Sequence, residues 1–329
     1  WQSGLLPGLF GFVFLCGFFH VSDVDVGYHL RTGAHIMAGY GIPAVNTFSS
    51  TVPNETWLLQ QWLGATIYYV VYSVAGLAGL ISFKALLATL VMFLVWCNAR
   101  HTAGRDSLWP AWIVTVWVLM ARVRFFERPD LMSAVLFALV WYLDQRHRND
   151  RRWQWLVLPL LMAFWANLHS GVIYGFVLLG VLAGVEGIEW LWSKLNSSAA
   201  LRLPPVLEPT HEGTRIGGGS GRPPFTELLV RTLSLLLSVA AVVVSLELIN
   251  PNGFQVVLVP ISQFTSPFWR GIIVGYFPPT WANAKVFYCS LAGLVVLQAL
   301  TWQHRNLRLL VPSLVFGFLA VSTQRSVLF

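Results

Sequence analysis

The feature that most constrains this chain is a series of apolar runs that recurs along almost its whole length. They fall at about 4–22, 57–75, 77–98, 108–121, 131–143, 154–168, 171–193, 228–249, 284–302 and 307–322. A helix needs roughly 20 apolar residues to cross a bilayer, so the longer runs are candidate spans and 108–121 and 131–143 are short ones. The pattern predicts an all-α polytopic membrane protein.

The composition supports this prediction. Hydrophobic residues make up 56% of the 329 residues and charged residues only 11%, whereas a soluble domain is about 25% charged. The three cysteines, Cys16, Cys97 and Cys289, fall inside apolar runs, which indicates packing residues. The formal charge of +7 fits the basic inner loops of a membrane protein, so we expect no nucleic-acid partner.

The positions of the basic residues decide between two topologies, which differ in whether the run 57–75 crosses the membrane. If it lies along the membrane surface instead, most of the 21 Lys and Arg residues fall on one side, Arg231 and Arg308 among them. Basic loops favour the cytoplasmic side, and Gln60 and Gln61 suit an interfacial helix. We therefore expect about nine transmembrane helices, a cytoplasmic N-terminus, and juxtamembrane helices in the first outer loop.

We expect a single transmembrane domain over 1–329, truncated at both ends. Within it, 23–75 forms the first outer loop and 250–283 another outer loop. The segment 194–226 is rich in proline and glycine and predicts a flexible cytoplasmic linker.

The first polar segment, Asp23 to Arg31, directly follows the first apolar run. Charge is costly beside a membrane, so two carboxylates, His29 and Arg31 in nine residues suggest a functional site. The pair Asp23 and Asp25 can hold a divalent cation such as Mg²⁺ or Mn²⁺, or one carboxylate can act as a general base. The alternative is a solvated helix end or a helix cap. His29 lies four residues after Asp25, so a helix would place both on one face.

The segment 122–130 contains three arginines on a side that should be poor in them. Guanidinium groups fit phosphate oxygens, so an anionic ligand such as a phosphate would explain them. We expect Arg124 and Arg128 to bind the phosphate and Asp130 to orient a substrate. The alternative is an interfacial loop with internal ion pairs.

Further polar residues are expected on the same side. Asn167 and His169 form a tight corner between two runs and can reach a bound group or a metal, although His169 can equally be a core histidine bonded to backbone. Arg270 lies among aromatic residues that suit a lipid chain, a sugar face or an interfacial anchor. Arg325 is a third candidate for the phosphate. The chain carries no triad spacing, zinc-type Cys/His set, Walker loop or dinucleotide fingerprint.

The arrangement resembles the GT-C superfamily of membrane glycosyltransferases, which includes protein O-mannosyltransferases, aminoarabinose transferases and oligosaccharyltransferases. More narrowly, it looks like a set of bacterial membrane proteins whose first loop runs Asp-x-Asp-x-x-x-His-x-x-x-Gly, then Ile-Pro-x-x-Asp-x-Phe-Ser, then Trp and Glu-Trp-Leu. The matching residues in this chain are Asp23, Asp25, His29, Gly33, Ile42, Pro43, Phe48, Ser49 and Trp57. Arg128-Pro-Asp130 and Asn167-Leu-His169 also resemble that set.

Two positions depart from the pattern. Asn46 stands where the set has Asp, and Gln61 stands where it has Glu. An amide keeps the shape and the hydrogen bonds of a carboxylate but loses its basicity and its affinity for metals. The departures therefore leave open a catalytically silent relative.

The resemblance implies a glycosyltransferase in the bacterial inner membrane that takes a sugar from a polyprenyl-phosphate donor at the outer face. Inverting transfer to a lipid, glycan or protein acceptor would use Asp23, Asp25 and His29 as catalytic residues. A cofactor is not required by the pattern, although a divalent cation at the aspartates is compatible with it. The alternative is a silent GT-C-like subunit that has other membrane subunits as partners.

Overall fold

The structure, a computed structural model, describes residues 2–50, 54–103, 107–147, 150, 152–200, 224–267, 278–282, 284–300 and 307–322. The described residues are helical and include no strand; Val45 and Thr56 form an isolated bridge. Three helices are long and apolar enough to cross a membrane, within α3 (Trp62–Ala103), α7 (Val172–Ala200) and α8 (Pro224–Ile249). The prediction of an all-α chain is confirmed for these residues, and the count of nine spans stays a prediction.

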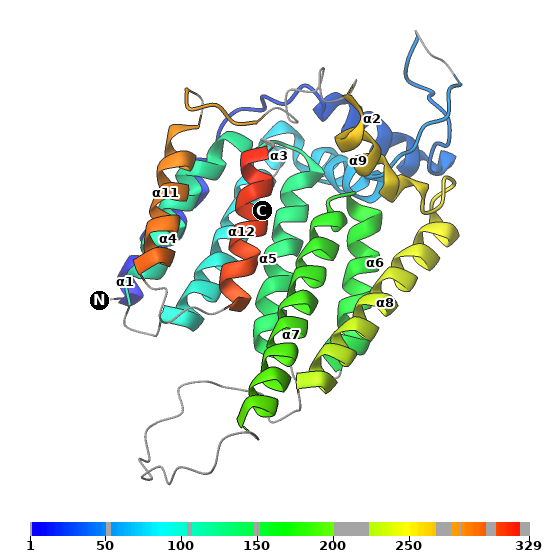
Figure 1. Ribbon diagram of the computed structural model, residues 1–329. Coiled ribbons are helices and arrows are strands. Elements are labelled where there is room, and N and C mark those ends of the chain that lie inside the picture. The colour runs from blue at the N-terminus through cyan, green and yellow to red at the C-terminus, as the bar shows by residue number, and fades with distance from the viewer. Residues whose placement is uncertain are drawn as a thin grey trace.

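Most helices run side by side in a bundle (Figure 1). Besides α3, α7 and α8 it contains α1 (Gln2–Gly17), α4 (Trp109–Ala121), α5 (Pro129–His147), α6 (Leu158–Leu168), α11 (Lys285–Leu300) and α12 (Leu307–Ser322). The short helices α2 (Val26–His35) and α9 (Gln255–Thr265) lie at the upper edge of the figure. We call this the loop-rich end; it comprises residues 18–50, 54–61, 122–128, 169–171 and 250–267.

The long helix α3 is broken at one residue. Gly76 has φ 61° and ψ −154°, which lies outside the helical region and suits only glycine. The break separates a segment that packs against α2 at the loop-rich end from a longer one that descends into the bundle (Figure 1). It falls one residue after the run 57–75, which was predicted to lie along the membrane surface.

The first helix ends earlier than its apolar run. A Cβ atom on Gly17 would lie 2.9 Å from the backbone of Ala85, so glycine permits a close crossing of α1 over α3. Just beyond it, the carbonyl of Phe19 accepts a hydrogen bond of 3.0 Å from Lys84 Nζ. The chain therefore leaves the helix at Gly17 and is fixed to α3 within two residues.

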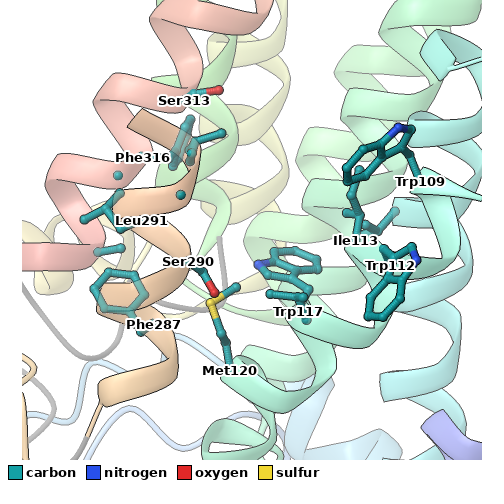
Figure 2. Close-up of a pocket in the computed structure, with 16 residues that line it drawn as sticks. Trp109, Trp112, Ile113, Trp117, Met120, Phe287, Ser290, Leu291, Ser313 and Phe316 are labelled. Atoms are coloured by element: carbon teal, nitrogen blue, oxygen red, sulfur yellow. The ribbon is translucent and has the colours of Figure 1, made fainter. Parts of the chain in front are cut away.

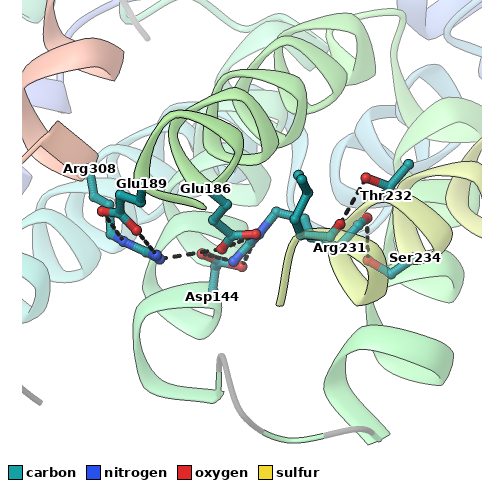
Figure 3. Close-up of polar contacts among 8 residues, drawn as sticks. Asp144, Glu186, Glu189, Arg231, Thr232, Ser234 and Arg308 are labelled. Atoms are coloured by element: carbon teal, nitrogen blue, oxygen red, sulfur yellow. Dashed lines mark hydrogen bonds and ion pairs between the residues drawn. The ribbon is translucent and has the colours of Figure 1, made fainter. Parts of the chain in front are cut away.

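A buried ionic network joins four helices near the opposite end of the bundle (Figure 3). Arg231 of α8 donates to Asp144 of α5 over 2.7 Å and to Glu186 of α7 over 2.8 Å. Arg308 of α12 reaches Glu186 at 3.3 Å and Glu189 at 2.6 Å. Both arginines were predicted to lie in inner loops, but Arg231 is buried, and it pairs there with Asp144 at the end of one apolar run and with Glu186 inside another.

Candidate functional site

The centre of the loop-rich end is a three-residue ionic cluster. Arg128 donates from Nε and Nη2 to both carboxylate oxygens of Asp23, the second bond being 2.6 Å long. Nη2 also lies 2.8 Å from Oδ2 of Asp25. The Asp23 side chain is 2% exposed and that of Asp25 48% exposed. Asp23 therefore holds the guanidinium, whereas Asp25 faces the surroundings.

Arg128 is held in place by the residues around it. Its neighbour Glu127 is fully buried and forms a 2.6 Å ion pair with Lys84. Its own carbonyl accepts a 3.0 Å hydrogen bond from the hydroxyl of Tyr68. The next residue, Pro129, packs so closely on Gly64 that a Cβ there would lie 2.8 Å from the ring. The helix α3 thus fixes the backbone on both sides of Arg128.

The electrostatics of Arg128 follow from this geometry. Burial by itself lowers the pKa of the guanidinium, but the hydrogen bonds and the charge of Asp23 outweigh burial, and the pKa is raised overall. Arg128 is therefore a permanent cation at any working pH. Its Nε and Nη2 donate to the two carboxylates, and no described residue accepts a hydrogen bond from Nη1.

Arg124 and Asp130 form a second, looser pair. Arg124 Nη2 lies 3.5 Å from Asp130 Oδ2, and both side chains are partly exposed. The short 3-10 helix Arg122–Arg124 and the following turn place the pair beside Arg128. The structure thus brings together the two predicted phosphate ligands.

His29 lies in α2, packed between Tyr28 and Tyr68 at ring-centroid distances of 4.8 Å and 6.4 Å. Burial lowers the pKa of His29 to about 4, against smaller opposing effects from Asp130 and Asp23. The ring is therefore neutral at pH 7. Asp25 occupies the N-cap position of α2, but its side chain makes no capping bond.

His169 lies at the corner between α6 and α7, where its Nδ1 is 2.8 Å from Ser133 Oγ and accepts a 3.0 Å hydrogen bond from the backbone of Gly171. It interacts electrostatically with Asp130 and His29. The histidine therefore belongs to the same region as the ionic cluster.

Other predicted site residues lie elsewhere. Asn167 is buried and bridges helices, since it accepts from Trp62 Nε1 over 3.1 Å and donates to Ser245 over 3.2 Å. Arg31 is exposed and lies over the ring of Phe48, 5.9 Å from its centroid. Arg270 and Arg325 lie outside the described residues.

The two amides that replace expected carboxylates both make hydrogen bonds inside the loop. Asn46 Oδ1 accepts from the backbone of Phe48 and of Ser49, over 3.2 Å and 3.0 Å. Gln61 Nε2 donates to the hydroxyl of Tyr28 over 3.4 Å. Both residues therefore shape the first loop, as short polar side chains commonly do.

The aspartates do not fit a metal site in this arrangement. A divalent cation needs several oxygen ligands, but both carboxylates pair with Arg128, whose charge repels a cation. The described residues also contain no group of three or more His, Cys, Asp and Glu side chains placed to hold a metal ion. We assign no step to a metal.

An apolar cavity of about 810 Å³ lies between α4, α11 and α12. Figure 2 shows Trp117 and Met120 of α4 facing Phe287 and Ser290 of α11. The lining residues on α4 extend from Trp109 to Met120. Met120 lies four residues before Arg124 in the sequence. The cavity thus reaches from one end of α4 nearly to the arginine segment.

Sequence reasoning missed several residues that build the site. Lys84 and Glu127 pair across 43 residues of sequence and position Arg128, and Ser133 contacts His169. Lys84 inside an apolar run was the available signal, because a charged residue there needs a partner. Comparison of the chain with protein-family models, curated proteins and solved structures finds no significant match. The resemblance to the GT-C superfamily stays a prediction.

Proposed function

We propose that this chain is a glycosyltransferase that moves a sugar from a polyprenyl-phosphate donor to a hydroxyl of a lipid, glycan or protein acceptor, with inversion at the anomeric carbon. The observation that carries the proposal is the cluster of Arg128, Asp23 and Asp25. A second arginine, Arg124, follows four residues after Met120, which lines an apolar cavity.

The arginines are suited to the donor phosphate. Nη1 of Arg128 takes no part in the bonds to the two aspartates. The side chain of Arg128 is 24% exposed. Arg124 contacts Asp130 over 3.5 Å, a long ion pair that a phosphate can replace. As the bond between the anomeric carbon and the phosphate oxygen breaks, negative charge builds on the phosphate. Fixed guanidinium groups stabilise that charge, and losing one such contact slows a reaction on the order of a hundredfold.

The two aspartates take different roles. Asp25 is accessible, so it acts as the general base that removes the proton from the acceptor hydroxyl. The hydroxyl oxygen forms the new bond to the anomeric carbon while the phosphate leaves with the electron pair of the old bond. Asp23 is buried against Arg128 and orients it. His29 is neutral and can accept or donate a hydrogen bond at the acceptor side.

The apolar cavity is the site we assign to the polyprenyl chain. Its lining is almost wholly aliphatic and aromatic, and the end at Met120 lies close in sequence to Arg124. A lipid whose chain occupied this cavity would have its phosphate near the arginines.

The proposal includes a membrane topology. The N-terminus is cytoplasmic, about nine helices span a bacterial inner membrane, and the loop-rich end faces outward. The basic residues of the inner loops support this orientation, as do the three helices long enough to span.

A catalytically silent subunit of a membrane complex is the second candidate. One observation favours it: Asn46 and Gln61, at positions where the resemblance has carboxylates, make hydrogen bonds within the first loop. A subunit of that kind would keep the fold and the lipid cavity without the reaction.

A transfer assay separates the two candidates. Purified chain in nanodiscs is given a short-chain polyprenyl-phosphate sugar with a radiolabelled sugar, and release of the sugar to acceptors in a membrane extract is followed. Asp25→Asn should remove transfer and leave donor binding, whereas Arg122→Ala, an exposed arginine of the same segment, should change neither. Donor binding without transfer in the wild type would favour the silent subunit.

A further inference from the structure

A chain of hydrogen bonds at the corner between α6 and α7 surrounds His169, to which the reaction above assigns no role. Trp165 Nε1 donates to Ser133 Oγ over 2.8 Å, and Ser133 Oγ lies 2.8 Å from His169 Nδ1. The backbone N–H of Gly171 donates to the same Nδ1 over 3.0 Å. Trp165 and Ser133 are both fully buried.

The chemistry of the groups sets the direction of every bond in this chain. An indole N–H and a peptide N–H can only donate. Because Nδ1 of His169 accepts from Gly171, it carries no proton, and the proton of the neutral ring lies on Nε2. The hydroxyl of Ser133 then donates to Nδ1, and its oxygen accepts from Trp165.

The close approach of Gly171 depends on its missing side chain. A Cβ atom at this position would lie 2.6 Å from Ser133 Oγ and 2.8 Å from His169 Nδ1. Any larger residue would push the serine or the histidine away and lengthen the bond from the backbone. The corner is thus shaped so that two donors converge on one ring nitrogen.

We propose that Ser133 and Trp165 are positioning residues that fix His169 in the Nε2–H tautomer, so that His169 acts as a hydrogen-bond donor and not as a general base. Nε2 is the ring nitrogen that faces away from Ser133 and Gly171, and the ring lies within electrostatic range of Asp130 and His29. In the bound complex the acceptor is an anionic oxygen of the donor phosphate; this last step rests on the proposed function.

Nitrogen NMR of the full chain with ¹⁵N-labelled histidine tests the tautomer directly. The resonances of His169 are identified by their loss in His169→Gln. We expect an unprotonated Nδ1 and a protonated Nε2 at neutral pH. In Ser133→Ala the Nδ1 resonance should shift, because this nitrogen loses one of its two donors. Ser170→Ala, a buried serine in the same corner, should leave it unchanged.

Two spectral results would overturn the assignment. One is a protonated Nδ1 in the wild type at neutral pH, and the other is a Ser133→Ala spectrum in which the His169 resonances do not move. Neither result depends on any ligand, so the tautomer is tested independently of the proposed function.

Binding of a short-chain polyprenyl phosphate tests the donor role. Glutamine carries an amide N–H₂ at a reach similar to Nε2, so His169→Gln should keep most of the affinity. His169→Ala should weaken binding roughly tenfold or more, as expected for loss of a hydrogen bond to a charged group. Equal losses in both variants would overturn the donor role. A wild type that does not bind would overturn the proposed ligand, while the spectra still decide the tautomer.

Discussion

Asp23 and Asp25 are two residues apart, yet the structure gives them opposite environments. Asp23 is buried and makes two bonds to Arg128, whereas Asp25 is half exposed and makes one contact with it. An ion pair whose carboxylate is buried is costly to break. When one partner is removed, the charge of the other is left without a counterion and is poorly solvated. An exposed contact contributes little.

Replacing Asp23 by asparagine should therefore lower the stability of the chain much more than replacing Asp25 by asparagine. Asp23→Asn should lower the free energy of unfolding by about 3 kcal/mol, and Asp25→Asn by less than about 1 kcal/mol. Thermal unfolding in one detergent, followed by tryptophan fluorescence, compares the two. Equal shifts would contradict the difference in environment on which their separate roles rest.

His29 gives a prediction for pH. Its pKa is about 4 in the folded chain and about 6.5 when unfolded. Between these values the unfolded chain binds the extra proton and the folded chain does not, so stability falls as the pH drops from 6.5 towards 4. The loss attributable to His29 is about 3 kcal/mol over this window.

The variant His29→Gln isolates this effect from the other titrating groups. The wild type should lose more stability than the variant between pH 7 and pH 4.5, measured by unfolding temperature. Parallel pH curves for the two proteins would show that His29 is not held neutral by burial.

At the scale of helices, the ionic network near the opposite end ties α5, α7, α8 and α12 together (Figure 3). Arg231 is buried between Asp144 and Glu186. Removing this cation would leave the buried Asp144 carboxylate without its partner, whereas Glu186 would keep its contact with Arg308. Leaving one buried charge unpaired is the costly way to break a buried pair.

Arg231→Met should therefore destabilise the chain by about 3–5 kcal/mol. A second change, Asp144→Asn, should recover part of the loss in the double variant, because the carboxylate that lost its partner is then replaced by a neutral amide. Arg146→Met is the control, since Arg146 is exposed and bonds only Tyr142 among the described residues. Chemical unfolding of the variants provides the measurement, and an unchanged midpoint for Arg231→Met would contradict the buried network.

The break in α3 depends on one glycine. No atom lies near the position of a Cβ on Gly76, so a substitution there would act through the backbone alone. Gly76→Ala should cost about 1–3 kcal/mol, because alanine rarely adopts the dihedral angles of this residue. Gly180→Ala, a helical glycine that also has open space around it, should be neutral or slightly stabilising. Equal changes in the free energy of unfolding for Gly76→Ala and Gly180→Ala would argue against a break of α3 at Gly76.

At the scale of the whole molecule, the apolar runs predicted the helices well. The run 307–322 coincides with α12, and 108–121 lies within one residue of α4, because lipid-compatible helices must be continuously apolar. The helix α9 was not predicted, since its 11 residues lie in a segment with several turn signals.

The candidate site was predicted as a set of residues, but its geometry was not. The polar segments flanking apolar runs identified Asp23, His29, Arg128 and His169, and the structure brings these to one end. Sequence alone could not show that Arg128 bonds Asp23 across 105 positions, or that Asn167 serves helix packing. Such pairings depend on how the helices pack, which no local pattern encodes.

In the proposed function, the ionic cluster and the apolar cavity form one lipid-phosphate site, and photo-crosslinking tests this most directly. A polyprenyl-phosphate probe with a photoreactive group on its chain should label peptides of α4 between Trp112 and Met120. Unlabelled lipid phosphate should compete for this labelling. The variant Arg124→Ala should reduce it, whereas Arg122→Ala should not. Labelling spread evenly over the exposed helices, or equal in both variants, would contradict the account.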